Sequence, residues 1–254
     1  MKRGWRATVA FMKKWTGGGP VTLSSDQELV LKVFIGTISE AMLLDHPAYL
    51  EVLRDHRHAS AWMPVNVNLV SQFQDPDRVF IQHEQEGLLA PQVSLPVQGS
   101  AFTDAVVAAR QLKDLVNSFG LITTITLRLE WSAPGARLLL TLDAGTVPAE
   151  RYRTLSLRVG QSTEAKNAAN RDQDFTLEVS SGSRTASIPA SSLHRLLYPD
   201  VVFGAGKIVM QTLRLPIRDL AERGVDPSDL RSIAFVFDRS GTCVLYVGDI
   251  QISH

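Results

Sequence analysis

The fold class is decided by the stretch TLRLEWSAPGARLLLTLDAG at residues 126–145. TLRLEW alternates polar and apolar side chains, and ARLLLTL is a second apolar-rich run that follows a Pro-Gly turn. Alternation with a period of two puts apolar side chains on one face of a β-strand. The stretch therefore predicts strands at residues 122–131 and 136–142, with a hairpin-like turn at residues 132–135.

Similar runs recur at nearly even intervals along the chain. They predict further strands at residues 65–70, 78–82, 152–159, 175–179, 184–189, 208–215, 232–238 and 244–252. A second hairpin-like turn is expected at Ser181-Gly182-Ser183. Many short strands separated by turns are typical of a sandwich or barrel, whereas a parallel sheet requires strands that alternate with long helices. We predict a mainly β protein in which residues 64–254 form an antiparallel β-sandwich of the jelly-roll type.

Helical patterns precede these strands. Ser25 and Glu28 match a capping box, and apolar residues then recur at three- and four-residue spacing as far as Met42. A second short helix is expected at residues 47–53. Residues 1–63 are therefore assigned to a helical N-terminal segment.

One inserted helix is predicted within the β region. Thr103-Asp104 resembles a helix cap, and the pattern ends at Gly120. The apolar stripe of this helix would consist of Val106, Val107, Leu112, Leu115 and Val116.

Charge and composition limit the classes of partner. Lys and Arg total 26, as do Asp and Glu, so the formal net charge is zero and nucleic acid is not an expected partner. No apolar run is long enough to span a membrane. Lys13 and Lys14 interrupt the apolar start of the chain, which therefore has no clear signal peptide. The single cysteine, Cys243, is expected to be a buried and inert thiol.

Three segments resemble the galactose-binding-like jelly rolls found among carbohydrate-binding modules. They are QFQDPDRVFIQHEQEG (residues 72–87), LRLPIRDL followed by GVDPSDLRSIAFVFD (residues 213–238), and LYVGDIQI (residues 245–252). The resemblance implies a polysaccharide or glycan surface as partner. It also implies a structural calcium ion held by Glu84 and Asp249, because related jelly rolls often hold such an ion between the opening and closing strands. The alternative interpretation is that Asp249 faces solvent, and no other cofactor is expected.

The chain also resembles the C-terminal region of secreted bacterial α/β-hydrolases of the lipase or esterase type. This likeness rests on LSSDQELVLKVFIGTISEAML (residues 23–43), HPAYLEVLRDH (residues 46–56) and GWRATVAFMKKWTGGGP (residues 4–20). It implies an extracellular or periplasmic location. The nearest match to a G-x-S-x-G nucleophile elbow is residues 160–164, which lack the second glycine, so the catalytic core of such a hydrolase is absent from these residues.

Sugar binding usually requires exposed aromatic rings with polar groups beside them. The candidates are Trp131, Tyr152 and Tyr246, and packing in the core is the alternative for each ring. We therefore expect an accessory, carbohydrate-binding-like module related to the C-terminal part of secreted hydrolases.

Two alternatives to this expectation stay open. The first is a stand-alone hydrolase that acts on ester or glycosidic bonds, with Glu84 and Glu86, Glu130 or Glu178 as candidate carboxylates. The second is a homodimer formed through the N-terminal helix, because a pair of helices alone cannot bury both of its apolar faces. Val30, Val33 and Phe34 are the residues expected in that interface.

Overall fold

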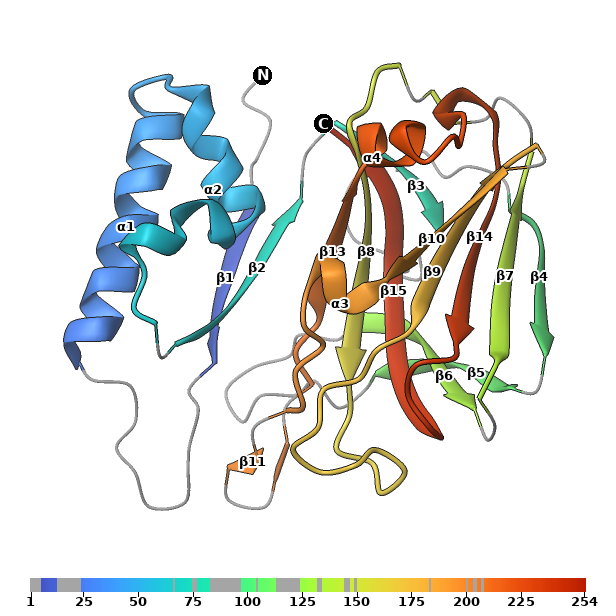
Figure 1. Ribbon diagram of the computed structural model, residues 1–254. Helices are drawn as coiled ribbons and strands as arrows, with labels where there is room; N and C mark the ends of the chain where they lie inside the picture. Colours follow the sequence, from blue (N-terminus) through green and yellow to red (C-terminus); the bar gives the residue numbers. More distant parts are fainter. Residues whose placement is uncertain are drawn as a thin grey trace. The chain divides into compact units, whose positions relative to one another are not determined.

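The computed structural model of the chain divides into two compact units, Met1–Pro76 and Asp77–His254 (Figure 1). The structure describes residues 6–12, 24–65, 67–74, 77–82, 97–103, 105–112, 124–131, 134–143, 147–148, 150–182, 184–199, 201–202, 205–206 and 208–254. Each unit is described by itself. No helix among these residues is long and apolar enough to cross a membrane.

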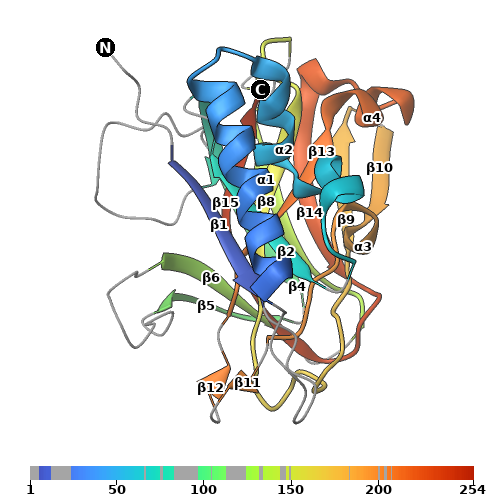
Figure 2. The ribbon, with the colours of Figure 1, turned by 90° about the vertical axis from the view of Figure 1, so that its left-hand side faces the viewer.

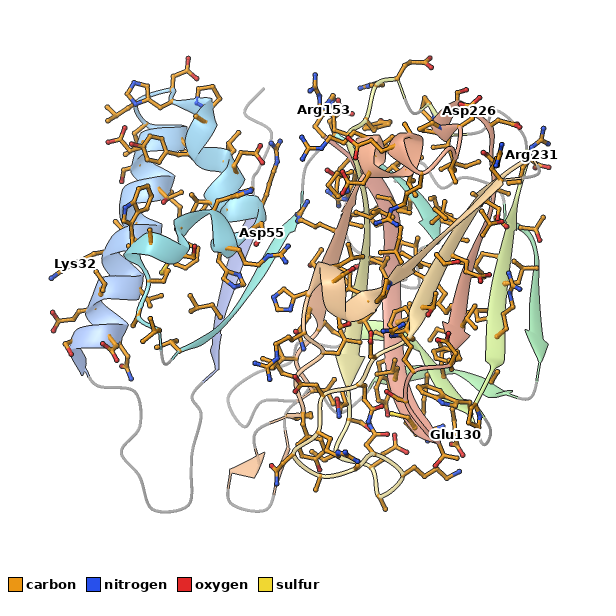
Figure 3. All side chains as sticks on the ribbon, viewed as in Figure 1. Lys32, Asp55, Glu130, Arg153, Asp226 and Arg231 are labelled. Atoms are coloured by element: carbon orange, nitrogen blue, oxygen red, sulfur yellow. The ribbon has the colours of Figure 1, made fainter. Side chains whose placement is uncertain are left out.

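Unit 1 combines helices with a two-stranded antiparallel ribbon. Its elements are β1 (Arg6–Met12), α1 (Ser24–Met42), η1 (Pro47–Tyr49), α2 (Leu50–Arg54), η2 (His56–Trp62) and β2 (Asn68–Gln74). The helices lie on one side of the ribbon that β1 and β2 form (Figures 1 and 2). Asp55 begins η2 by accepting a hydrogen bond from Arg57 N, and Figure 3 shows its position. Burial raises the pKa of Asp55, but the hydrogen bonds from Arg57 outweigh this effect and lower it to about 2.

The two helices predicted for the N-terminal segment are confirmed, with bounds close to those expected. Val30 and Phe34 on α1 pack with Leu53 and Leu69 in the core of unit 1. Because Val30 and Phe34 are used in this core, they do not form the exposed face that the homodimer prediction requires.

The predicted boundary at residue 63 differs from the observed division after Pro76. The difference arises because β2 pairs with β1 from the start of the chain. The prediction assigned β2 to the sandwich and did not include β1 as a strand.

Unit 2 contains two large antiparallel sheets and a short two-stranded one (Figure 1). The five-stranded sheet has the order β10 (Arg184–Pro189), β9 (Thr176–Ser181), β14 (Leu230–Phe237), β7 (Ala136–Leu142) and β4 (Val97–Thr103). The six-stranded sheet has the order β13 (Gln211–Pro216), β8 (Thr154–Gln161), β15 (Cys243–Ser253), β6 (Thr124–Trp131) and β5 (Ala105–Leu112), and β3 (Arg78–Gln82) also pairs with β15. Shorter elements are α3 (Ala190–Leu193), β11 (Val201–Val202), β12 (Ala205–Gly206), α4 (Ile217–Glu222) and η3 (Pro227–Asp229).

One hydrophobic core joins the two sheets. Alternate residues of β7 are buried, as the period-two pattern predicts. At one end of the core, the ring of Phe175 packs against Phe235 and Phe237, and Trp131 stacks on Phe237 with ring centroids 4.1 Å apart. Side chains from both sheets thus share one interior. The predicted antiparallel β-sandwich is confirmed.

The inserted helix predicted after Thr103 is wrong over Ala105–Leu112. These residues form β5, which pairs antiparallel with β6 along its whole length. The spacing of the run AVVAARQL is compatible with either structure, and its valines favour a strand where a neighbouring strand such as β6 is available for pairing. Residues 113–120, which complete the predicted helix, lie outside the described residues.

The two predicted turns have different outcomes. Ser181 pairs with Arg184, so the turn between β9 and β10 is a hairpin, as predicted. Gly182 has a φ of 50°, a conformation that glycine adopts without strain. The turn at residues 132–135 instead joins β6 in one sheet to β7 in the other, so the prediction of a hairpin there is wrong.

Candidate functional site

The six-stranded sheet has one face in the sandwich core and an opposite face lined by polar and charged side chains. On β8, for example, Leu155, Leu157 and Val159 belong to the core, so Ser156 and Arg158 point to the opposite side. The same alternation holds on β3, β6 and β13, and on β15 with a shift of one residue at Asp249. We define the outer face by the side chains at these positions: Arg78, Phe80, Thr126, Arg128, Glu130, Ser156, Arg158, Thr212, Arg214, Tyr246 and Gln251.

A β-bulge on β15 shapes the middle of the outer face. Arg158 on β8 pairs with Gly248, but the next pairs shift by one residue, so that Ser156 pairs with Gln251. The extra residue is Asp249, whose φ is 47° and whose side chain is buried. Its Oδ2 accepts a hydrogen bond of 2.9 Å from Arg158 Nη1. The bulge therefore pairs a carboxylate with an arginine on the outer face.

Next to this pair, a row of side chains crosses four strands. Backbone pairing aligns Arg214 on β13 with Ser156 on β8, then with Gln251 on β15 and Phe80 on β3. Ser156 Oγ, Gln251 Oε1 and Thr126 Oγ1 are buried and have no hydrogen-bond partner within the part of the chain that the structure describes. Because buried polar atoms in proteins are nearly always hydrogen-bonded, these three oxygens are candidates for ligand contacts.

A charged network lies at the end of the outer face where β15 starts, and Figure 3 shows Glu130 at this end. Arg128 contacts Glu130 at 2.7 Å and Glu164 at 2.5 Å, Lys166 pairs with Glu130, and Tyr246 donates to Glu164 at 2.7 Å. Hydrogen bonds from Lys166 and Arg128 lower the pKa of Glu130, and the hydrogen bond from Arg128 lowers the pKa of Glu164. Burial and the bond to Glu164 raise the pKa of Tyr246 to about 12. Both carboxylates are thus ionised at neutral pH, so neither is a proton donor.

An apolar cluster covers part of the same face beside this network. Met210, Val244 and Tyr246 pack together, with Ile208 against them. Gly160 on β8 makes this packing fit, since a Cβ atom there would lie 2.8 Å from Met210 Sδ and 2.9 Å from Ile208 Cγ2. The cluster closes this end of the outer face, whereas the middle, around Arg158, is polar.

The loop that supplies Glu164 and Lys166 is fixed by Asn167. The Asn167 amide donates to Ser162 O at 2.9 Å and to Val244 O at 2.8 Å, while Val244 N donates to its Oδ1 at 2.6 Å. Val244 lies just beyond the point where pairing of β15 with β8 ends. The side chain of Asn167 therefore replaces a strand residue in the hydrogen-bond ladder.

The three aromatic residues predicted to bind sugar are buried. Trp131 is 1% exposed, stacks on Phe237 and donates its Nε1 hydrogen to Gly241 O, so the prediction of an exposed platform is wrong for this ring. Tyr152 is also buried, and Tyr246 lies on the outer face within the apolar cluster. Their large apolar surfaces are used in packing, which is the alternative that the sequence left open.

The predicted calcium ligands are not brought together within the described residues. Glu84 lies outside those residues, and Asp249 contacts Arg158. The described residues contain no group of three or more His, Cys, Asp or Glu side chains that could hold a metal ion. The calcium site stays a prediction.

The prediction of a buried thiol at Cys243 is confirmed. Cys243 is fully buried, and burial raises the pKa of its thiol to about 12. Ser162, in the elbow-like segment, accepts hydrogen bonds from Glu164 N and the Asn167 amide. It follows the end of β8 and does not stand at the strand-to-helix turn of a nucleophile elbow.

Apart from Glu130 and Tyr246, the residues of the outer face were not identified from the sequence, although the signal was present. Ser156, Arg158 and Arg214 are the polar members of alternating strands that were predicted correctly. A search limited to aromatic rings and carboxylates passes over them.

Neither a protein-family model nor a curated protein matches the sequence. Among solved structures, a family 30 carbohydrate-binding module is 17% identical, with coverage of 70% of this chain and 88% of its own, and a TM-score of 0.46. A family 11 carbohydrate-binding module of a cellulosomal cellulase of Clostridium thermocellum is 11% identical, with 71% and 96% coverage and a TM-score of 0.41. An exo-beta-agarase is 12% identical, with 68% and 25% coverage and a TM-score of 0.42. These TM-scores are all below 0.5, so the proposals below rest on the chain's own residues.

Proposed function

We propose that unit 2 is an accessory carbohydrate-binding module and that its ligand lies on the outer face of the six-stranded sheet. The observation that carries this proposal is the group of buried oxygens of Thr126, Ser156 and Gln251 beside the Arg158–Asp249 pair. A sugar hydroxyl both donates and accepts hydrogen bonds. Serine, threonine, amide and guanidinium groups on one rigid sheet match that chemistry.

The rigidity of the site supports binding specificity. Ser156 and Gln251 lie on neighbouring central strands, and the hydrogen bond to Asp249 fixes the Arg158 guanidinium. Groups that are already ordered lose little conformational entropy when a ligand binds.

The state of the carboxylates supports a module without catalysis. Glycoside hydrolysis requires one protonated and one ionised carboxyl group. Glu130 and Glu164 both have lowered pKa values, and Glu178 pairs with Arg137 on the other sheet. The location outside the cell and the association with a hydrolase, implied by the resemblance of residues 4–56, are part of this proposal.

The test is affinity electrophoresis of the full chain in gels that contain cellulose derivatives, xylan, agarose, alginate or polygalacturonate. Ser156→Ala removes one hydroxyl from the outer face and adds no volume. The matched control is Ser187→Ala, at an exposed position on β10 of the other sheet. One lost hydrogen bond corresponds to about 0.5–1.5 kcal/mol, so we expect affinity to fall about two- to tenfold.

The outcomes separate clearly once circular dichroism shows that both variants are folded. Retardation by at least one polysaccharide, weakened by Ser156→Ala and unchanged by Ser187→Ala, supports the proposal. Absence of retardation in every gel, or equal weakening by the two variants, contradicts it.

A further inference from the structure

We infer that the Arg158 guanidinium is the cation that neutralises Asp249, in the place where the resemblance to jelly rolls implies calcium. The two side chains belong to the neighbouring strands β8 and β15, and Arg158 Nη1 lies 2.9 Å from Asp249 Oδ2. The stability of unit 2 then does not depend on a metal ion at Asp249. This role goes beyond the proposed function and holds whether or not the outer face binds sugar.

Asp249 lies at the point where β15 exchanges one neighbouring strand for another. β15 pairs with β6 as far as Val247, and it pairs with β3 from Ile250 onward. The bulge falls between these pairs, and Asp249 has a φ of 47° there. Aspartate adopts this left-handed conformation more readily than most residues that have a side chain. The contact with Arg158 therefore ties the junction of β3, β6 and β15 to β8.

A carboxylate at this position requires a positive charge beside it. The side chain of Asp249 is 6% exposed, and that of Arg158 is 15% exposed. Removal of an ionised group from water is costly unless an opposite charge and hydrogen bonds compensate for the lost hydration. Arginine is suited to this role because its guanidinium is effectively always protonated and matches the geometry of a carboxylate.

The same ion pair disfavours calcium at Asp249. Calcium binds carboxylate oxygens at about 2.4 Å, so an ion on this carboxylate would lie within about 6 Å of Arg158 Nη1. Two positive charges at that separation repel each other. Because the guanidinium already compensates the carboxylate, calcium would gain less here than at a carboxylate without a cation. The other predicted ligand, Glu84, lies outside the described residues, so only the Asp249 end of the predicted site is at issue.

The first experiment compares thermal unfolding of the full chain in EGTA and in calcium chloride, followed by circular dichroism. Calcium present at about 100 times its Kd would raise the unfolding midpoint by about 5–10 °C. We expect midpoints that agree within about 1 °C. Asp249→Asn is measured alongside, because asparagine tolerates the left-handed conformation but removes the charge of the predicted ligand.

The second experiment tests the ion pair itself. Arg158→Ala removes a cation from a buried carboxylate, so the midpoint should fall by at least about 6 °C. Addition of Asp249→Asn to this variant should recover about half of the loss, because the uncompensated charge is then gone. The matched control is Arg137→Ala. Arg137 pairs with Glu178 at 2.8 Å on the other sheet, where the two side chains are 41% and 23% exposed, so its loss should stay below about 4 °C.

The results separate the possible roles of Arg158. A rise in the midpoint with calcium that Asp249→Asn removes overturns the inference, and so does a double variant that is no more stable than Arg158→Ala. Equal midpoints in EGTA and calcium support it, as does a rise that persists in Asp249→Asn, because that ion binds at other residues. If Arg158→Ala does not fold, the calcium comparison on the unchanged chain still decides.

Discussion

Replacement of Asn167 by alanine should destabilise the sandwich more than most substitutions in a loop. Asn167 is 4% exposed, and its amide completes the hydrogen-bond ladder at Val244. Alanine would leave Val244 N–H, Val244 C=O and Ser162 C=O buried without these partners. Each buried group that loses its partner costs about 1–3 kcal/mol, and local rearrangement recovers part of this cost. We therefore expect the free energy of unfolding to fall by about 2–4 kcal/mol.

The assay is urea-induced unfolding of the full chain at pH 7, followed by circular dichroism. Asn170→Gly is the matched control, because Asn170 is an exposed asparagine of the same loop whose φ of 57° glycine also adopts. Asn167→Asp is a second variant. It keeps the acceptor for Val244 N–H but directs a charged oxygen at two carbonyl groups, so it should destabilise at least as much. A loss below about 1 kcal/mol for Asn167→Ala would refute the role assigned to this side chain.

Two further predictions concern the region around β15. Gly160→Val should lower the free energy of unfolding in urea by about 1–3 kcal/mol, because its Cβ would press on Met210 and Ile208. Gly241→Ala, which has open space around it, should lower this free energy by less. Equal losses for the two variants would contradict the packing described. The folded-state pKa of Cys243, about 12, lies above the ordinary value of 9.0, so the stability that this thiol contributes is complete below pH 9 and is lost as pH rises toward 12. Between pH 8 and pH 10 the free energy of unfolding should fall by about 1 kcal/mol more for the unchanged chain than for the Cys243→Ala variant. Equal falls would show that burial does not raise the pKa of the thiol.

The strands could be predicted from the sequence where one face is apolar and the other polar. The bounds of β7 and β10 agree with the prediction at both ends. Short alanine- and valine-rich runs lack this contrast, which explains why β5 was predicted as a helix. The ribbon partner of β2 comes from the first residues of the chain, and such long-range pairing leaves no local signal in the sequence.

The candidate site could be predicted only in part. Alternation along β8 suffices to place Ser156 and Arg158 away from the core. The same rule fails on β15, because the extra residue Asp249 reverses which later side chains face outward. No local sequence pattern indicates that reversal. The contact between Asp249 and Arg158 and the outward position of Gln251 therefore could not be predicted from the sequence.

The proposal that unit 2 binds sugar on the outer face is tested most directly by nuclear magnetic resonance. The full chain, labelled with ¹⁵N, is titrated with oligosaccharides of cellulose, alginate and polygalacturonate. The account predicts that the largest saturable shift changes occur at Ser156, Arg158, Asp249 and Gln251. Saturable changes centred on Arg137 and the other face of the sandwich, or no change with any of the sugars, would contradict it.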